Sequence, residues 1–107
     1  MDVSSKPASA TIVAQHAAAS ASLPFHDTRD FDAARRGYLG GVDPAVVTDA
    51  DGTVAWDNDS YAFVAGEAPD TVHPSLWRQS TLVAMQGLYE VVPGIYQVRG
   101  LDLSNMT

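Results

Sequence analysis

Histidine and carboxylate side chains can hold a metal ion or transfer a proton, and histidine is scarce in this sequence. The three histidines, His16, His26 and His73, lie in three separate segments. No two of them have the H-x-H or H-x-x-H spacing of zinc ligands. His26 is directly followed by Asp27, which is not a spacing for joint coordination, and His73 suits the polar start of a helix. We therefore predict that none of the histidines is a metal ligand or a catalytic residue.

Four aspartates and a glycine between positions 49 and 59 offer the carboxylate oxygens that calcium prefers. An EF-hand register sets Asp49, Asp51 and Gly52 at the third, fifth and sixth loop positions. Val47 then takes the first position and Asn58 the twelfth, so both anchoring carboxylates are missing. A hairpin turn followed by an acidic helix cap explains the same residues without a bound ion.

Other patterns that mark active sites are also absent from the sequence. Ser75, Ser80 and Ser104 have no G-x-S-x-G context and no base nearby, so a serine hydrolase is not indicated. The glycines between positions 37 and 41 lack the lysine of a phosphate-binding loop. Without cysteine, the chain has no disulfide, thiolate zinc site or cysteine nucleophile. We predict no catalytic, cofactor-binding or metal-binding residue in this chain.

Length and charge narrow the class of protein further. With 107 residues, of which 46% are hydrophobic, the sequence suits one small globular domain or a piece of a larger one. Its formal net charge of -7 repels phosphate groups, so we expect no nucleic-acid partner. No apolar run approaches the roughly 18 to 20 residues of a membrane span. Because no convincing signal peptide begins the chain, we expect a cytoplasmic rather than a secreted protein.

The elements that would position any site follow an N-terminal segment rich in Ala and Ser. Residues 1–24 are predicted to form a disordered or weakly helical tail, because they can bury little apolar area. Capping and turn residues then predict three short elements: a helix over residues 30–36 that Gly37 ends, a hairpin of residues 46–47 and 54–56 with its turn at Asp51-Gly52, and a short helix that Asp57 caps and Gly66 ends.

Two stronger elements are predicted nearer the C-terminus. Pro74 suits the start of a helix over about residues 75–86, with Gly87 as its stop. Within it, Trp77 is expected in the core, and Arg78 is expected to pair with a neighbouring carboxylate. Residues 88–92 and 95–98 flank Pro93-Gly94 and predict a hairpin. The fold class is therefore α+β, with a core that is thin for this length.

Several separated motifs occur in one order over about residues 25–107. They are Asp30-Phe-Asp-Ala-Ala-Arg-Arg-Gly37, Asp49-Ala-Asp-Gly52, Trp56-Asp57, Tyr61-Ala-Phe63, Gly66-Glu-Ala-Pro69, His73-Pro-Ser-Leu-Trp-Arg-Gln-Ser80, Gly87-Leu-Tyr-Glu-Val91, Gly94-Ile-Tyr-Gln-Val-Arg-Gly100 and Asp102-Leu-Ser-Asn-Met-Thr107. Together they resemble the N-terminal part of the linear alkyl sulfatases, or alkyl/aryl-sulfatases, of the metallo-β-lactamase superfamily. His73 stands where that family usually has Asn, a departure that touches no chemistry.

The resemblance implies an αββα metallo-β-lactamase fold, in which the C-terminal hairpin would supply the first strands. It also implies an enzyme that hydrolyses primary alkyl sulfate esters to alcohol and sulfate, with two zinc ions that activate water. The family's zinc motif, H-x-H-x-D-H, comes after the residues that match Asn105 to Thr107. We therefore expect residues 25–107 to be a lead-in scaffold, truncated before the zinc motif, that holds no zinc and is inactive alone.

Two hypotheses remain open at this point. In the first, the chain is the N-terminal fragment of an alkyl sulfatase, and its partner is the missing downstream part of the enzyme. The hairpin would then lack its usual sheet neighbours, and its open edges would favour self-association. In the second, the chain is a stand-alone small interaction module derived from such an enzyme. The reading frame downstream of the gene distinguishes them.

Overall fold

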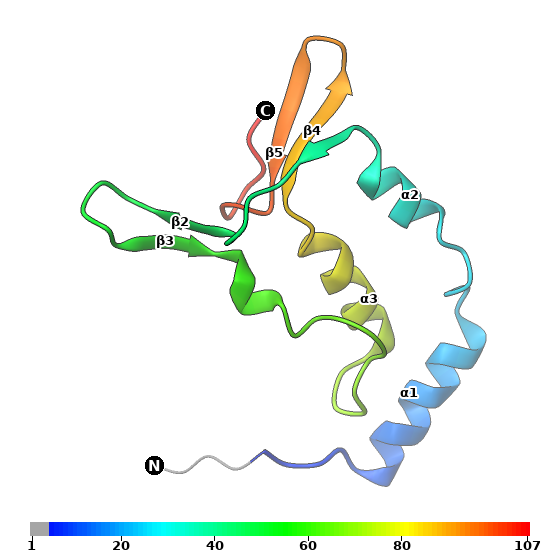
Figure 1. Cartoon of the computed structure of the whole chain (residues 1–107). Helices are drawn as coiled ribbons and strands as arrows, with labels where there is room; N and C mark the ends of the chain where they lie inside the picture. The colour runs from blue at the N-terminus through cyan, green and yellow to red at the C-terminus, as the bar shows by residue number, and fades with distance from the viewer. Residues whose placement is uncertain (1–4) are drawn as a thin grey trace.

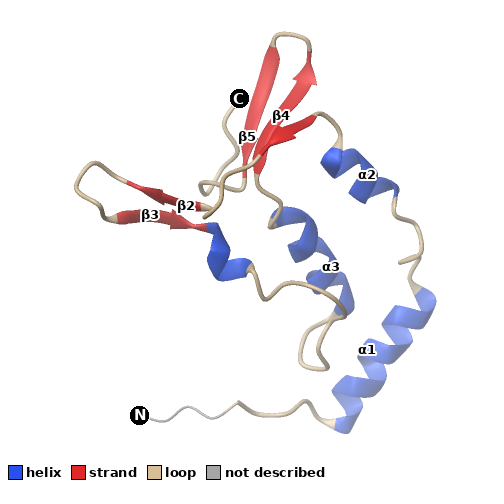
Figure 2. Cartoon of the chain, in the orientation of Figure 1, coloured by secondary structure: helices blue, strands red, loops and turns tan. Residues whose placement is uncertain are grey.

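The computed structural model describes residues 5–107, and in this part of the chain helices accompany antiparallel strands. The predicted α+β class is confirmed (Figure 2). The elements are α1 (Ala10–Ser22), α2 (Arg29–Arg35), β1 (Tyr38–Gly40), β2 (Val46–Thr48), β3 (Val54–Asp57), the 3-10 helix η1 (Asn58–Tyr61), α3 (Pro74–Val83), β4 (Gly87–Val92) and β5 (Ile95–Arg99). None of the helices described is long and apolar enough to cross a membrane.

The C-terminal hairpin forms where the sequence predicts it. β4 and β5 pair antiparallel, and Pro93 and Gly94 make the turn between Val92 and Ile95. Gly94 has a φ of 87°, a conformation that residues with a Cβ atom rarely adopt. Figure 1 shows the two strands in orange shades, rising together from the end of α3.

The expectation that both edges of this hairpin are open is wrong on the β4 side. β1 pairs antiparallel with β4 and makes a three-stranded sheet in the order β1-β4-β5. Gly37 permits the approach: its carbonyl accepts a hydrogen bond from the Glu90 N–H at 2.8 Å, and a Cβ there would lie 2.0 Å from the Glu90 oxygen. On the other edge, Val98 forms a two-hydrogen-bond bridge with Met106. β1 was not predicted from the sequence, because a strand of only three residues, one of them Gly40, has too short a pattern to be recognised as a strand.

The second hairpin and the helix after it follow the sequence only in part. β2 and β3 pair around the predicted turn. Asp57 caps η1 as predicted, since its carboxylate accepts a hydrogen bond from the Ser60 N–H at 3.2 Å. The helix, however, ends at Tyr61 and not at Gly66. The residues after it form turns, in which the Ala65 N–H donates to the Phe63 carbonyl two residues back.

α3 begins as predicted and ends earlier. Its N-cap is His73, whose Nδ1 accepts a hydrogen bond from the Ser75 N–H at 3.1 Å, and Pro74 occupies the first helical turn. The predicted end at residue 86 is wrong by three residues. Gln86 instead bonds both backbone groups of Val42, with its Nε2 donating to the carbonyl at 2.9 Å and its Oε1 accepting from the N–H at 3.2 Å. Gly87 is the first residue of β4 and does not cap the helix.

α1 lies inside the segment predicted as a disordered or weakly helical tail, whose first four residues fall outside the described part of the chain. Ser9 caps the helix by accepting a hydrogen bond from the Ile12 N–H at 3.3 Å. The alanines favour helix formation, but no residue of α1 is buried. Its side-chain hydrogen bond to the rest of the fold joins His16 Nδ1 to the Asp70 carbonyl at 2.8 Å.

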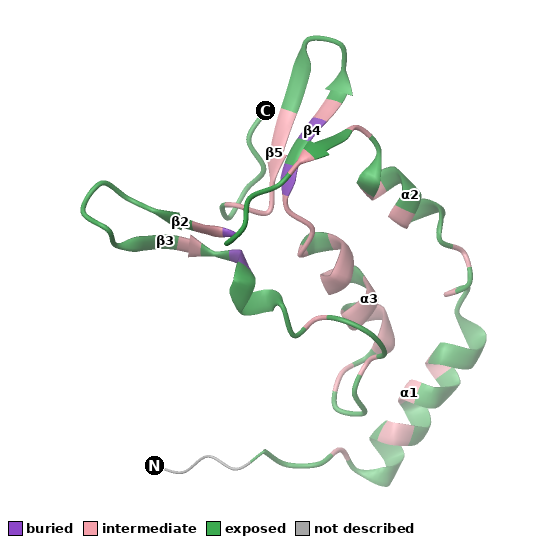
Figure 3. Ribbon diagram, in the orientation of Figure 1, coloured by how far each residue is buried: buried purple, intermediate pink, exposed green. Residues whose placement is uncertain are grey.

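The core is as thin as the composition suggests. Among the apolar residues that the structure describes, only Ala45 and Tyr89 are buried (Figure 3). The Cα radius of gyration is 17.2 Å, whereas a compact domain of this length has about 13 Å. The accessible surface is 7857 Å², against about 5,700 Å² for a folded monomer of this mass. The elements are therefore arranged openly, with much of their apolar surface in water.

We expect limited proteolysis to cleave α1 well before the region from Ser75 to Val98. Local unfolding of α1 exposes no buried residue, so its opening free energy is small. A time course with a nonspecific protease, read by mass spectrometry, measures the order of cleavage. Equal resistance of the two regions would contradict the tail assignment.

Candidate functional site

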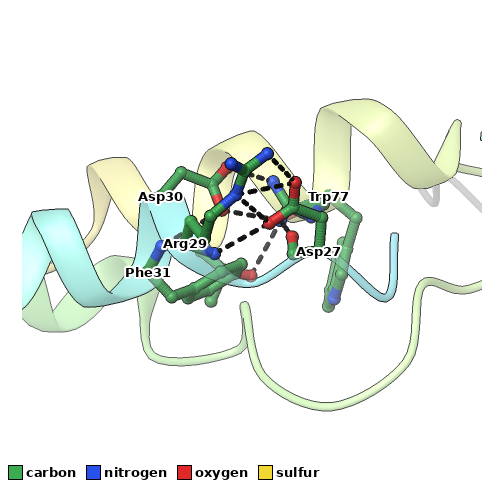
Figure 4. A network of polar contacts seen from close by, with 7 residues as sticks. Asp27, Arg29, Asp30, Phe31 and Trp77 are labelled. Carbon is green, nitrogen blue, oxygen red and sulfur yellow. Dashed lines mark hydrogen bonds and ion pairs between the residues drawn. The ribbon is translucent and has the colours of Figure 1, made fainter. Parts of the chain in front are cut away.

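A polar network centred on Arg78 joins α3 to the start of α2. The Arg78 guanidinium binds both carboxylate oxygens of Asp30, and its Nη2 also donates to the Asp27 carbonyl at 2.6 Å. Its Cζ atom lies 4.8 Å from the centroid of the Phe31 ring. Figure 4 shows Asp27, Asp30 and Phe31 gathered beside Trp77 of α3. The predicted pairing of Arg78 with a carboxylate is confirmed, across 48 positions of sequence.

A second ion pair holds Asp27 in place. The Asp27 carboxylate accepts hydrogen bonds from the Arg29 backbone N–H at 3.2 Å and from Arg29 Nη2 at 2.6 Å. The hydrogen bond with Arg78 lowers the pKa of Asp30, and that with Arg29 lowers the pKa of Asp27. Each carboxylate is thus ionised and paired at neutral pH. The network positions two helices and holds no group poised to transfer a proton.

Trp77 is expected in the core, and the structure buries it only in part. Its indole Nε1 donates to the Gly66 carbonyl at 3.0 Å, and its ring lies 6.1 Å from that of Phe63. Trp77 is half-buried, since the core around it is open. These contacts fix the loop between η1 and α3 against the helix.

A groove of about 680 Å³ opens on the other side of α3. Its walls combine apolar and polar side chains from several elements, among them Asn58, Tyr61, Leu76, Val83, Arg99 and Leu103. Asn58 is buried and donates from Nδ2 to the Ala84 carbonyl at 2.9 Å. Trp56, also in the wall, donates from Nε1 to the Gly100 carbonyl at 3.1 Å. These bonds tie β3 and η1 to the end of α3 and to the loop after β5.

Arg99 of β5 also lines the groove. Its Cζ lies 4.1 Å from the centroid of the Tyr89 ring, and its Nη1 donates to the Ala34 carbonyl at 3.2 Å. Its Nε donates to the Gln97 side chain at 2.6 Å. Burial raises the pKa of Tyr89, so its phenol stays protonated at neutral pH. Sequence reasoning did not single out Arg99 or Asn58, because their partners lie 65 and 26 positions away.

The histidines and the described aspartates do not gather into a reactive cluster. The rings of His16 and His73 lie edge to face with centroids 5.4 Å apart, and His26 is on a separate segment. In the Asp49 to Thr53 turn, carboxylates accept hydrogen bonds from the turn's own N–H groups. Hydrogen bonding with the Asp49 side chain, and then with Thr53, lowers the pKa of Asp51 to about 2. Across residues 5–107, no three or more His, Asp or Glu side chains are grouped to hold a metal ion.

Comparisons with known proteins point to one enzyme class. No protein-family model matches the chain. It is 50% identical over 86 residues to an alkyl/aryl-sulfatase of Saccharomyces cerevisiae, a match that covers 79% of the chain and 13% of that protein. It is 47% identical over 104 residues to an (R)-specific secondary-alkylsulfatase of a Pseudomonas species, with 96% of the chain and 16% of that protein covered.

A linear primary-alkylsulfatase from Pseudomonas gives a similar match, 46% identical over 104 residues. Among solved structures, the stereoselective inverting sec-alkylsulfatase of a Pseudomonas species superposes with a TM-score of 0.87 at 45% identity. That superposition covers 98% of this chain and 17% of the sulfatase. The chain therefore spans about a sixth of the length of these relatives.

Replacing Asp30 with Asn should lower the free energy of unfolding at neutral pH, since Arg78 loses its charged partner. Because the folded-state pKa of Asp30 is lowered, its contribution is complete above the unfolded carboxyl pKa and is lost as pH falls through the lowered value. The difference between wild type and Asp30→Asn, measured by urea unfolding, should shrink toward zero in acid.

Asp32→Asn is the matched control. Asp32 lies in the same first turn of α2 and has no ion pair with any residue described. Its replacement should change the unfolding free energy less than Asp30→Asn does. An Asp30→Asn effect that stays constant from neutral to acid pH would show that the ion pair with Arg78 does not stabilise the fold.

Proposed function

This chain is homologous to the N-terminal part of the alkyl/aryl-sulfatases, and on that premise we propose that it is a scaffold segment of such an enzyme. The complete enzyme would hydrolyse primary alkyl sulfate esters to alcohol and sulfate. The observation that carries the proposal is the shared fold at 45% identity over 98% of the chain. In this reading the chain supplies helices and strands that support a site whose ligands lie elsewhere in the enzyme.

The distribution of polar groups supports a scaffold role. The charged network of Arg78, Asp30 and Asp27 is satisfied internally. The buried amide of Asn58 is also hydrogen-bonded, so neither group is left for a substrate. The full-length family is expected to use two zinc ions to activate water. The residues described do not fit that group, because they bring no sufficient ligand set together.

The place of these elements in the enzyme fold is part of the proposal. We assign residues 25–107 to the lead-in helices and first strands of an αββα metallo-β-lactamase domain, with residues 1–24 as a tail. The antiparallel sheet β1-β4-β5 would be the beginning of the first sheet of that sandwich. The bridge between Val98 and Met106 supports the assignment, since it brings the residues after β5 back beside its outer edge.

A second candidate function follows from the exposed apolar surface. Leu103 is 88% exposed and Phe63 69%, an arrangement that also suits a stand-alone interaction module. A module needs a partner other than a sulfatase polypeptide. A monomeric chain in analytical ultracentrifugation would favour this candidate, and self-association or poor solubility would favour the scaffold.

The purified chain should release no sulfate from dodecyl sulfate above a protein-free control. The physical reason is that residues 5–107 bring together no ligand set for the metal that would activate water. Sulfate is measured by ion chromatography, with the Pseudomonas linear primary-alkylsulfatase as the positive control. Turnover that scales with chain concentration would refute the scaffold proposal.

The chain should also retain no stoichiometric zinc. After incubation with zinc and dialysis, elemental analysis should find far less than one ion per chain. The full-length Pseudomonas enzyme, treated in parallel, checks that dialysis itself does not strip a catalytic site. One or two tightly held ions per chain would contradict this prediction.

A further inference from the structure

The groove beside α3 leaves an unusual amount of apolar surface in water. Leu76 is 61% exposed, Val83 66% and Leu103 88%, and all three side chains line the groove. They come from α3 and from the loop after β5, two segments that Trp56 and Asn58 tie together. The apolar wall is therefore a fixed surface and not a set of scattered side chains, and such surfaces mark interaction sites.

Arg99 adds a charge requirement to this surface. Its guanidinium stacks on Tyr89 and donates to a carbonyl and an amide oxygen, but it has no carboxylate partner among the residues described. Asp102 also lines the groove, and its carboxylate accepts a hydrogen bond from the Leu103 N–H at 2.7 Å. An occupant that covered Arg99 without offering an acceptor would bury an unpaired charge, which is costly. An apolar occupant that carries a negatively charged group therefore suits this surface.

The size of the exposed surface indicates a macromolecule. The accessible area of the whole chain, of which the groove is one part, exceeds that of a folded monomer of this mass by about 2,100 Å². A standard protein interface buries about 800 Å² on each partner. The same fold occurs in a solved sulfatase of which it forms only 17%. The remaining residues of that polypeptide are therefore the class of partner that the comparison supports.

Resting on the proposed function, we propose that this groove is the docking surface for the remainder of an alkyl sulfatase polypeptide. Apolar side chains of that partner fill the space between Leu76, Val83 and Leu103. A partner carboxylate binds Arg99, where it completes the hydrogen bonding of the guanidinium. The remaining sulfatase residues thus supply the core that this chain lacks by itself.

The direct test is a chimera in which this chain replaces the matching segment of the Pseudomonas linear primary-alkylsulfatase. A photo-reactive benzophenone amino acid is placed at position 103, in the groove, and in a control chimera at position 54. Val54 is exposed on the β2–β3 hairpin and is not part of the groove. Mass spectrometry should find cross-links from position 103 to sulfatase residues outside the graft, and few or none from position 54.

Substitutions provide a second readout in the same chimera. Val83→Asp should lower the midpoint of thermal unfolding by at least about 3 °C, and Val54→Asp should not. Arg99→Ala should lower it too, with Arg99→Lys in between because lysine keeps the charge without the planar fork. Cross-links to a second copy, no cross-links from position 103, or equal effects of Val83→Asp and Val54→Asp would each overturn the proposal.

If the chimera does not fold, a measurement on the chain itself tests the proposal. The wild-type chain should bind the anionic apolar dye 8-anilinonaphthalene-1-sulfonate, and Val83→Asp should weaken that binding several-fold more than Val54→Asp does. Equal dye binding by Val83→Asp and Val54→Asp would overturn the proposal that the groove is a docking surface. Failure of the proposed function is a different result: a folded chimera that cross-links as expected but releases no sulfate.

Discussion

Too little apolar surface is buried within the described chain for hydrophobic packing to fix its helices and sheets relative to one another. Ala45 and Tyr89 are the buried apolar residues among those described, and burial of apolar area is ordinarily the main source of stability. Directional polar contacts between distant segments fix their relative positions instead. Arg78 binds α3 to the start of α2, Gln86 binds the loop after β1, and Asn58 binds η1 to the end of α3. The geometry of the molecule follows from these few bonds.

This dependence explains which features the sequence could predict. Local signals specify local elements: Asp51-Gly52 and Pro93-Gly94 give their hairpins, and His73-Pro74 gives the start of α3. Long-range contacts decide the features that local signals miss. β1 exists because β4 lies beside it, and α3 ends early where Gln86 turns to bond Val42. No pattern within a window of a few residues contains that information.

In the candidate site, too, local chemistry could be predicted and long-range contacts could not. That Arg78 pairs with a carboxylate could be inferred from its chemistry, but the choice of Asp30 is set by the fold. The groove and the position of Arg99 were not predictable, since their walls come from elements that meet only in three dimensions. The resemblance to the alkyl sulfatases predicted more about function than the spacing of apolar residues did, because its motifs belong to a whole enzyme. The relatives' chemistry lies in a polypeptide about six times as long as this chain.

The two tryptophans give this arrangement an optical consequence. Each indole N–H is bonded to a carbonyl of a distant segment, Trp56 to Gly100 and Trp77 to Gly66. Trp56 lines the groove, whereas Trp77 contacts the loop between η1 and α3. Their fluorescence therefore reports on two separate regions, and single Trp→Phe variants resolve the two signals. A spectrometer can thus follow the groove and the helix-loop contact independently as the molecule assembles or unfolds.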